Sequence, residues 1–389
     1  MNPKIYILAL AAVTVGLVEL VVGGILPQIA ADLGVSVGTA GQLITVFAAV
    51  FAVAGPVLLT ITSKVGRKKL MLITMAIFVG ANVMTYFSAT YMMIMVARVI
   101  TSAAAALIVV LAITIAGKIA LPHQRAKSIG LVFMGVSSAL VLGVPIGIVL
   151  ADIIGWRALF LIIAVMAFLV MIMIYFLFED VPNEAQIPLK TQIKALGNIK
   201  LAGAHFATMF MLAGHYAFYA YFAPFLESTM HLSQTWISIC YFLFGIAAVG
   251  GGALGGMLAD KLGSRKAILS VISVFAIVLF ILPHTVFSFP LFLIVMMLWG
   301  TLSWSIAPPQ QNYIIESDPY TAELHQSFNN SALQIGIALG SGIGGVVIGQ
   351  TGSTTTVASV GSAVVVLAFL CALFSLTRPL PKSTSGTVE

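Results

Sequence analysis

Two charged side chains lie inside long apolar stretches of the sequence. Glu19 falls in the apolar run at 5–30, and Arg98 falls in another run at 92–117. A charged side chain at the centre of a membrane-spanning helix costs roughly 2.5 to 3.5 kcal/mol on insertion scales, so it usually faces the protein interior or water. At about 1.5 Å per residue, Glu19 is expected about 15 Å and Arg98 about 10 Å from the external ends of their helices. The arginine can approach the carboxylate if the two helices are neighbours.

This pair predicts a proton-coupling site. Burial favours the neutral acid and a nearby cation favours the carboxylate, so alternating exposure to the two sides of a membrane would shift the balance. A permanent structural ion pair is the alternative for both residues. Arg98 could also extend its charged end to the outer surface, because long basic side chains do this near helix ends.

Aromatic and polar residues recur at helical spacing in the run at 201–226. His215, Tyr219 and Phe222 share one face of that helix. Such a face can stack against a flat heterocycle and form hydrogen bonds to its edge, with Glu19 as a further contact. The alternative is a belt of aromatic residues at the membrane surface, since Phe222 lies near the external end.

Amide side chains mark a second polar face, in the run at 325–349. Gln326, Asn330 and Gln334 are four residues apart and share that face. Amides in hydrocarbon need partners, either on another helix or on a substrate. Trp304, in the run at 289–314, is predicted to form a stacking wall or simply to pack. We therefore place these four residues among the candidate substrate-binding residues.

The composition indicates that lipid surrounds most of the chain. Of 389 residues, 60% are hydrophobic and only 8% are charged. Apolar runs of about 20 residues recur, and only helices or closed barrels can span a membrane. The runs are too long and too rich in Leu, Ile, Ala and Met for barrel strands, so we predict twelve helices. They lie at 5–30, 39–62, 70–89, 92–117, 127–151, 156–178, 201–226, 233–258, 266–286, 289–314, 325–349 and 354–377.

The basic residues predict the orientation of these helices. With both termini in the cytoplasm, all of the 18 Lys and Arg residues except Arg98 and Arg157 fall within or beside cytoplasmic segments. This is the charge asymmetry of multi-pass proteins. The net charge of +6 is therefore explained by topology, and we predict no nucleic-acid partner. Cys240 and Cys371 support neither a disulfide framework nor a metal site.

The chain divides into two related parts. The longest polar segment, 179–200, contains Pro182 and Pro188 and falls after the sixth helix. It predicts a cytoplasmic linker between a six-helix bundle at 1–178 and a second bundle at 201–389. An internal repeat supports this division, because Ser63–Leu70 and Asp260–Ala267 follow the second helix of each half.

These motifs resemble those of the major facilitator superfamily. The segment Gly256–Lys266 is similar to its signature loop, which implies that Gly256, Asp260, Gly263, Arg265 and Lys266 latch neighbouring helices during conformational change. The first copy is weaker, since Ser63 stands where the family usually has aspartate. Its matching latch residues are Gly66, Arg67 and Lys68.

Further segments resemble drug:proton antiporters within that superfamily. Arg98 matches an arginine implicated in proton coupling, and Gly143, Pro145 and Gly147 resemble the Gly-Pro antiporter motif, with Val144 inserted. Over several helices the chain looks most like bacterial purine-base efflux pumps. The segments that carry this likeness are Val18–Ile29, Ala213–Tyr216 and His325–Asn329.

The resemblance implies an all-α membrane protein of the major facilitator fold that exports small molecules in exchange for protons. Purine bases or nucleosides, such as adenine and hypoxanthine, are the expected substrates, with multidrug or sugar efflux as alternatives. A proton gradient would supply the energy, without any cofactor. We expect a monomer in a bacterial plasma membrane.

Other function classes lack their signatures. The sequence contains no His-Glu-x-x-His, no Walker phosphate loop and no Gly-x-Ser-x-Gly elbow, so we predict that it is not an enzyme. A non-transporting membrane sensor would usually carry a sizeable soluble module, and no loop here is long enough for one.

Overall fold

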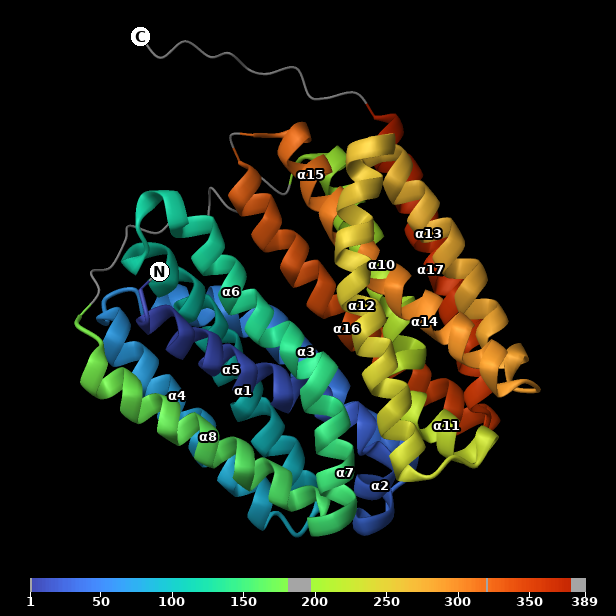
Figure 1. Cartoon of the computed structure of the whole chain (residues 1–389), viewed down its shortest axis with the longest axis horizontal. Helices are drawn as coiled ribbons and strands as arrows, with labels where there is room; N and C mark the ends of the chain where they lie inside the picture. The colour runs from blue at the N-terminus through green and yellow to red at the C-terminus, as the bar shows by residue number, and fades with distance from the viewer. Residues whose placement is uncertain (1, 181–196, 320, 379–389) are drawn as a thin grey trace.

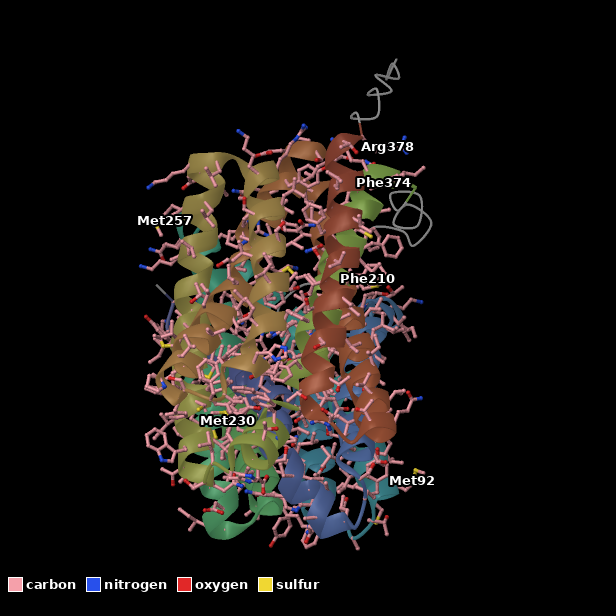
Figure 2. All side chains as sticks on the ribbon, turned by 90° about the vertical axis from the view of Figure 1, so that its right-hand side faces the viewer. Met92, Phe210, Met230, Met257, Phe374 and Arg378 are labelled. Carbon is pink, nitrogen blue, oxygen red and sulfur yellow. The ribbon has the colours of Figure 1, made fainter. Side chains whose placement is uncertain are left out.

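The computed structural model describes residues 2–180, 197–319 and 321–378, and within them it forms helices joined by short connections (Figure 1). The first helix (α1, Lys4–Gly24) begins, and the last helix (α17, Thr354–Thr377) ends, at the same end of the molecule, here called the terminal side; the opposite end is called the far side (Figure 1). Figure 2 places Phe374 and Arg378 toward the terminal side and Met92 and Met230 toward the far side.

The first part of the chain forms one bundle, here called the N-terminal bundle (Figure 1). Its elements are α1 (Lys4–Gly24), α2 (Leu26–Leu33), α3 (Val37–Ile61), α4 (Arg67–Phe87), α5 (Tyr91–Ile119), the short turn η1 (Pro122–Gln124), α6 (Arg125–Ser138), the π-helical turn η2 (Ala139–Gly143), α7 (Val144–Ile154) and α8 (Trp156–Leu177).

The second part forms the C-terminal bundle beside it (Figure 1). Its elements are α10 (Ile199–Tyr219), α11 (Phe222–Met230), α12 (Gln234–Leu262), α13 (Ser264–Ile281), the short turn η3 (Leu282–Thr285), α14 (Phe289–Ser305), α15 (Ala307–Ser317), α16 (Ala322–Thr351) and α17 (Thr354–Thr377). The predicted division into a bundle at 1–178, a linker at 179–200 and a bundle at 201–389 stays a prediction, because most of the proposed linker lies outside the described residues.

Each predicted run is helical, and several contain breaks that proline explains. Pro27 lies in the first turn of α2, which begins after the break at Ile25. Pro145 follows the π-helical turn η2, and Pro308 opens α15 after a break at Ile306. Proline has no N–H and removes one helical hydrogen bond, so it is tolerated best where a helix starts. Pro56, by contrast, lies inside the continuous helix α3.

Eleven helices in the described part are long and apolar enough to cross a membrane, which confirms the predicted all-α membrane architecture. The seventh span, α10 with α11, is not among them. It breaks at Ala220 and Tyr221 and carries Lys200, His205 and His215. This span is one of those that the sequence predicted to carry substrate-binding residues, among them His215 and Tyr219.

Three glycines on one face of α16 allow this helix to pack closely against α10. A side chain at Gly336, Gly340 or Gly344 would collide with backbone oxygens of α10, at Met209, Ala213 and Ala217. Their four-residue spacing places the three glycines on one face of α16, and small residues on a helix face allow two backbones to approach closely. This contact packs α16 directly against α10, the helix that carries His215 and Tyr219.

Candidate functional site

Glu19 lies where the two bundles meet. Its carboxylate on α1 accepts a hydrogen bond of 3.2 Å from the side-chain amide of Gln334 on α16. A small cavity beside the carboxylate is bounded by residues of both bundles: Leu20, Gly23, Ile44, Phe47, Ala48, Tyr216, Tyr219, Ala220 and Ile337. The predicted membrane carboxylate is therefore at the seam between bundles, where a relative movement of the bundles changes its surroundings.

This cavity is nearly closed. It measures about 10 Å³, which leaves room for roughly one water molecule. A solute can enter only if the helices that carry Tyr216, Tyr219 and Phe47 move apart. The conformation described here thus holds the central site in a collapsed form.

Arg98 is buried between three helices of the N-terminal bundle. Its guanidinium donates to the backbone oxygen of Val18 on α1 at 2.8 Å and to that of Leu43 on α3 at 3.4 Å. It also lies 4.3 Å from the ring centre of Phe47. The side chain is only 1% exposed, so it does not extend to the outer surface.

The arginine approaches Glu19 without forming a direct ion pair with it. It binds the peptide oxygen that immediately precedes Glu19 in the chain, while the carboxylate binds Gln334. One guanidinium nitrogen, Nη2, has no hydrogen-bond partner. An unpaired buried donor costs free energy. This nitrogen can therefore donate a hydrogen bond to a further acceptor if one comes within reach.

An aromatic cluster surrounds His215 in the C-terminal bundle. The ring of His215 stacks on Tyr219 at 5.2 Å and lies 5.2 Å from Trp299 on α14. Phe244 of α12 stacks on the same imidazole at 6.2 Å, and Phe222 joins the cluster through Trp299 at 5.3 Å. All five side chains are buried. The predicted face of His215, Tyr219 and Phe222 therefore points into the bundle and is not an aromatic belt at the membrane surface.

Several polar atoms of this region lack partners. His215 Nδ1, Tyr219 Oη and Trp299 Nε1 are buried without a hydrogen bond, as is Gln334 Oε1 at the seam. A buried polar group without a partner costs about 1–3 kcal/mol. Such groups in a native protein call for an explanation, such as water or a ligand. Here they offer donors and acceptors beside flat aromatic surfaces.

The other predicted substrate-binding residues lie apart from this cluster. Gln326 is half-buried and Asn330 is exposed on α16. Trp304 is 36% exposed, and the tryptophan that contacts His215 is Trp299 instead. Both tryptophans are on α14, and the sequence alone did not show which face of this helix meets α10.

A second polar cluster in the C-terminal bundle was not predicted. His205 Nε2 lies 3.1 Å from His325 Nδ1, and His205 Nδ1 lies 3.4 Å from the side-chain oxygen of Asn329. Thr208 donates to the same oxygen at 2.8 Å. These contacts join α10 to α16 near the terminal side. Within the described residues, no group of three His, Cys, Asp or Glu side chains is placed to hold a metal ion.

Comparison with known proteins identifies the family to which this helical arrangement belongs. Residues 8–323 match the model of the Major Facilitator Superfamily. The chain is 33% identical over 370 residues to the uncharacterized MFS-type transporter YbcL of Bacillus subtilis, covering 95% of each chain. The chain belongs to the major facilitator superfamily.

Other relatives and solved structures agree with this assignment. The inner membrane transport protein YdhP of Escherichia coli K12 is 28% identical over 97% of each chain. A probable sugar efflux transporter of Helicobacter pylori P12 is 25% identical, with 90% of this chain and 89% of that one covered. A bacterial homologue of the human lysosomal transporter Spinster, in an inward-facing and unoccupied conformation, superposes with a TM-score of 0.73 at 17% identity, covering 96% of this chain and 97% of that one. The chain is therefore a multi-pass membrane transporter and not an enzyme, and it has the predicted major facilitator fold.

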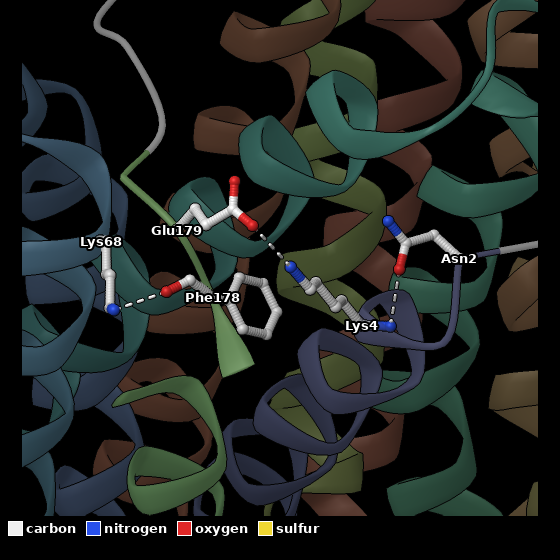
Figure 3. A network of polar contacts seen from close by, with 5 residues as sticks. All are labelled: Asn2, Lys4, Lys68, Phe178 and Glu179. Carbon is white, nitrogen blue, oxygen red and sulfur yellow. Dashed lines mark hydrogen bonds and ion pairs between the residues drawn. The ribbon is translucent and has the colours of Figure 1, made fainter. Parts of the chain in front are cut away.

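The first copy of the superfamily's signature loop is engaged with the end of α8. Lys68 donates to the backbone oxygen of Phe178, and Lys4 lies 3.9 Å from the carboxylate of Glu179 (Figure 3). Arg67 is buried at the start of α4, with Nε and Nη1 unpaired. A side chain at Gly66 would lie 3.3 Å from Asp180, so this glycine allows a close contact.

The second copy of the loop is largely open to its surroundings. Asp260, Arg265 and Lys266 are exposed, and nothing lies within 4 Å of a side chain built at Gly256. Gly263 has a φ of +77°, a backbone conformation that favours glycine. The two copies thus have different environments in this conformation, and their latch roles stay predictions.

The segment that resembles the antiporter motif packs between the bundles. Leu17 of α1 packs against Gly143, and Val21 of α1 packs against Gly147, in the space that a side chain at either glycine would fill. The backbone oxygen of Pro145 accepts a hydrogen bond of 2.9 Å from Ser238 on α12. The segment therefore contacts α1, which carries Glu19, and also contacts the opposite bundle.

Proposed function

We propose that the chain is a proton-coupled exporter of small planar molecules, with purine bases such as adenine and hypoxanthine as its foremost substrates. The observation that carries this proposal is the position of Glu19 at the seam, linked through Gln334 to the helix beside the aromatic cluster. A protonatable group and a recognition surface adjoin the same movable boundary, so each can influence the other.

The proposed substrate class follows from the chemistry of the cluster. Aromatic rings stack on flat heterocycles, and such stacking contributes about 1–3 kcal/mol per base. The unpaired atoms of His215, Tyr219 and Trp299 supply edge contacts once the cavity opens. A heterocycle that carries both donors and acceptors matches this set better than a purely apolar compound.

The orientation of the protein in the membrane follows from the distribution of basic residues. Lys4 and Lys68 lie together where α1 and α4 begin (Figure 3), and Arg378 lies at the terminal side (Figure 2). Basic residues at this side favour its location in the cytoplasm. In the proposed cycle, substrate enters from the cytoplasm and the bundles rock until the far side opens. Proton binding near Glu19 then favours release and return. The proton gradient is the energy source, no cofactor takes part, and a monomer in the plasma membrane is sufficient.

A vesicle experiment tests the proton coupling. The purified protein is reconstituted into liposomes that are loaded with radiolabelled adenine or hypoxanthine. Substrate flux is then measured with and without an imposed pH gradient. Glu19→Gln is expected to retain exchange of substrate but to lose the acceleration by the gradient. Asp152→Asn, which neutralises an exposed carboxylate of α7, is the matched control and should behave like the native protein. Unchanged acceleration in Glu19→Gln would remove Glu19 from the coupling.

Sugar efflux is the second candidate. It is favoured by the relatives from Helicobacter pylori that carry the name probable sugar efflux transporter, at 24–25% identity. Sugars also stack on tryptophan and bind amides such as Gln334. Counterflow of a radiolabelled monosaccharide in the same liposomes, in the absence of purine flux, would favour this candidate.

A further inference from the structure

Near the far side of the molecule, the two bundles are in contact around the side chain of Tyr221. Tyr221 lies in the break between α10 and α11 and is fully buried. Its hydroxyl donates to the backbone oxygen of Ser341 on α16 at 2.8 Å. The hydroxyl of Ser341 in turn lies 2.9 Å from that of Thr45, which belongs to α3 of the opposite bundle. Tyr221 is therefore at a junction of three helices from both bundles.

Glycines provide the space that this ring occupies. A side chain at Gly41 of α3 would overlap the Tyr221 hydroxyl, and one at Gly345 of α16 would lie 2.6 Å from it. One at Gly344 would lie 2.6 Å from Cε2 of the ring. The backbones meet beside this slot, since a side chain at Gly38 would lie 2.6 Å from the backbone oxygen of Gly345.

The slot crosses the boundary between bundles, which is the boundary that moves in transport. Tyr221, Gly344 and Gly345 belong to the C-terminal bundle and move together, whereas Gly41 belongs to the N-terminal bundle. When the far side opens, the ring must leave Gly41 while keeping its neighbours on α16. The tyrosine hydroxyl can then bind water, because it is the polar end of an otherwise apolar side chain.

We infer that Tyr221 is the residue that seals the outer gate, with Gly41 as its receptor on the opposite bundle. The inference rests on the proposed orientation, in which the far side faces the exterior. It assigns Tyr221 a positioning role: the residue does not bind substrate but sets how completely the far side closes. A larger residue at position 41 then holds the gate open.

Accessibility of a cysteine behind the gate tests this inference. Cys240 and Cys371 are replaced by serine, and Ile44→Cys places a thiol beside the cavity at Glu19. Labelling of intact cells with a membrane-impermeant maleimide reports access from outside. Gly41→Ala is expected to raise the labelling rate several-fold and to lower export. Gly80→Ala is the matched control, since nothing lies within 4 Å of its added methyl group and alanine favours helices at both positions.

Variants at position 221 separate gating from a purely structural role. Tyr221→Leu removes the ring and is expected to raise labelling as Gly41→Ala does. Adding Tyr221→Leu to Gly41→Ala should cause little further increase, because both changes break the same contact and their effects are then not additive. Tyr221→Phe keeps the ring in the slot and should largely preserve closure.

Either of two results would overturn the inference. One is labelling in well-folded Gly41→Ala that equals labelling in Gly80→Ala. The other is labelling in Tyr221→Leu that equals that of the native gate. Folding is checked by size-exclusion chromatography of the purified variants. Labelling does not depend on which substrate is carried or on proton coupling, so this test can fail while the proposed function holds.

Discussion

The two bundles bring different chemistry to the seam between them. On the N-terminal side, Glu19 and Arg98 are ionisable, and Arg98 is held by backbone oxygens of α1 and α3. On the C-terminal side, the cluster around His215 is aromatic, and its unpaired polar atoms include those of Tyr219 and Trp299. One bundle thus carries the groups suited to proton coupling, and the other carries a surface suited to recognition.

The difference shows how coupling between the two can arise. Charge in a membrane protein is stable only when its partners are fixed, and backbone oxygens are fixed partners. Recognition of a solute instead requires polar groups that are free until the solute arrives. Gln334 links the two bundles, because it belongs to α16 of the C-terminal bundle and its amide nitrogen binds Glu19 of the N-terminal bundle, while its amide oxygen is unpaired.

Of the three substitutions considered, replacement of Arg98 is expected to reduce export the most. Arg98→Ala removes two charge-assisted hydrogen bonds, each of which contributes about 1.5–3 kcal/mol. We expect export to fall by about two orders of magnitude, and Arg98→Lys to recover only part of it because lysine lacks the planar fork. Initial flux in liposomes measures this. Arg157→Ala, which removes the far-side partner of Asp32, is the control, and an equal loss there would deny Arg98 a special role.

Replacement of Trp299 is expected to weaken substrate binding by the aromatic cluster, with an effect of intermediate size. Trp299→Leu removes a stacking surface, and a loss of about 1.4 kcal/mol corresponds to a tenfold change in affinity. We expect the KM for a purine substrate to rise about tenfold while the response to a pH gradient persists. Trp304→Leu on the same helix is the matched control. An increase in KM of the same size in Trp304→Leu would place recognition on the other face of α14.

Replacement of Gln334 is expected to have the smallest effect, but to change both substrate binding and the pH dependence of export. Gln334→Leu removes the donor to Glu19 and the free acceptor, and side-chain hydrogen bonds in membrane proteins average about 0.6 kcal/mol. We expect about a threefold change in KM together with a changed pH dependence of export. Flux measured across a pH series at several substrate concentrations separates the two effects. A change in only one of them would mean that Gln334 serves one bundle and does not join them.

Helical periodicity predicted which of the candidate residues share a helix face. The buried face of His215, Tyr219 and Phe222 and the packing stripe of Gly336, Gly340 and Gly344 both follow from residues that recur at three or four positions. Trp304 on α14 was also selected from the sequence, as a stacking wall or a packing residue, although Trp299 is the tryptophan that meets His215. Periodicity indicates which residues share a face, but not which face meets a neighbouring helix.

The sequence by itself determined that this is a helical membrane protein with ionisable groups buried in its spans, because apolar length and the cost of charge in lipid are local properties of the chain. Only the tertiary structure decided which groups meet. Glu19 and Gln334 are 315 residues apart, and His205 and His325 are 120 apart. The slot for Tyr221 likewise requires glycines from α3 and α16. Such contacts depend on how whole helices cross and rotate, and the packing of all the side chains between them sets that geometry.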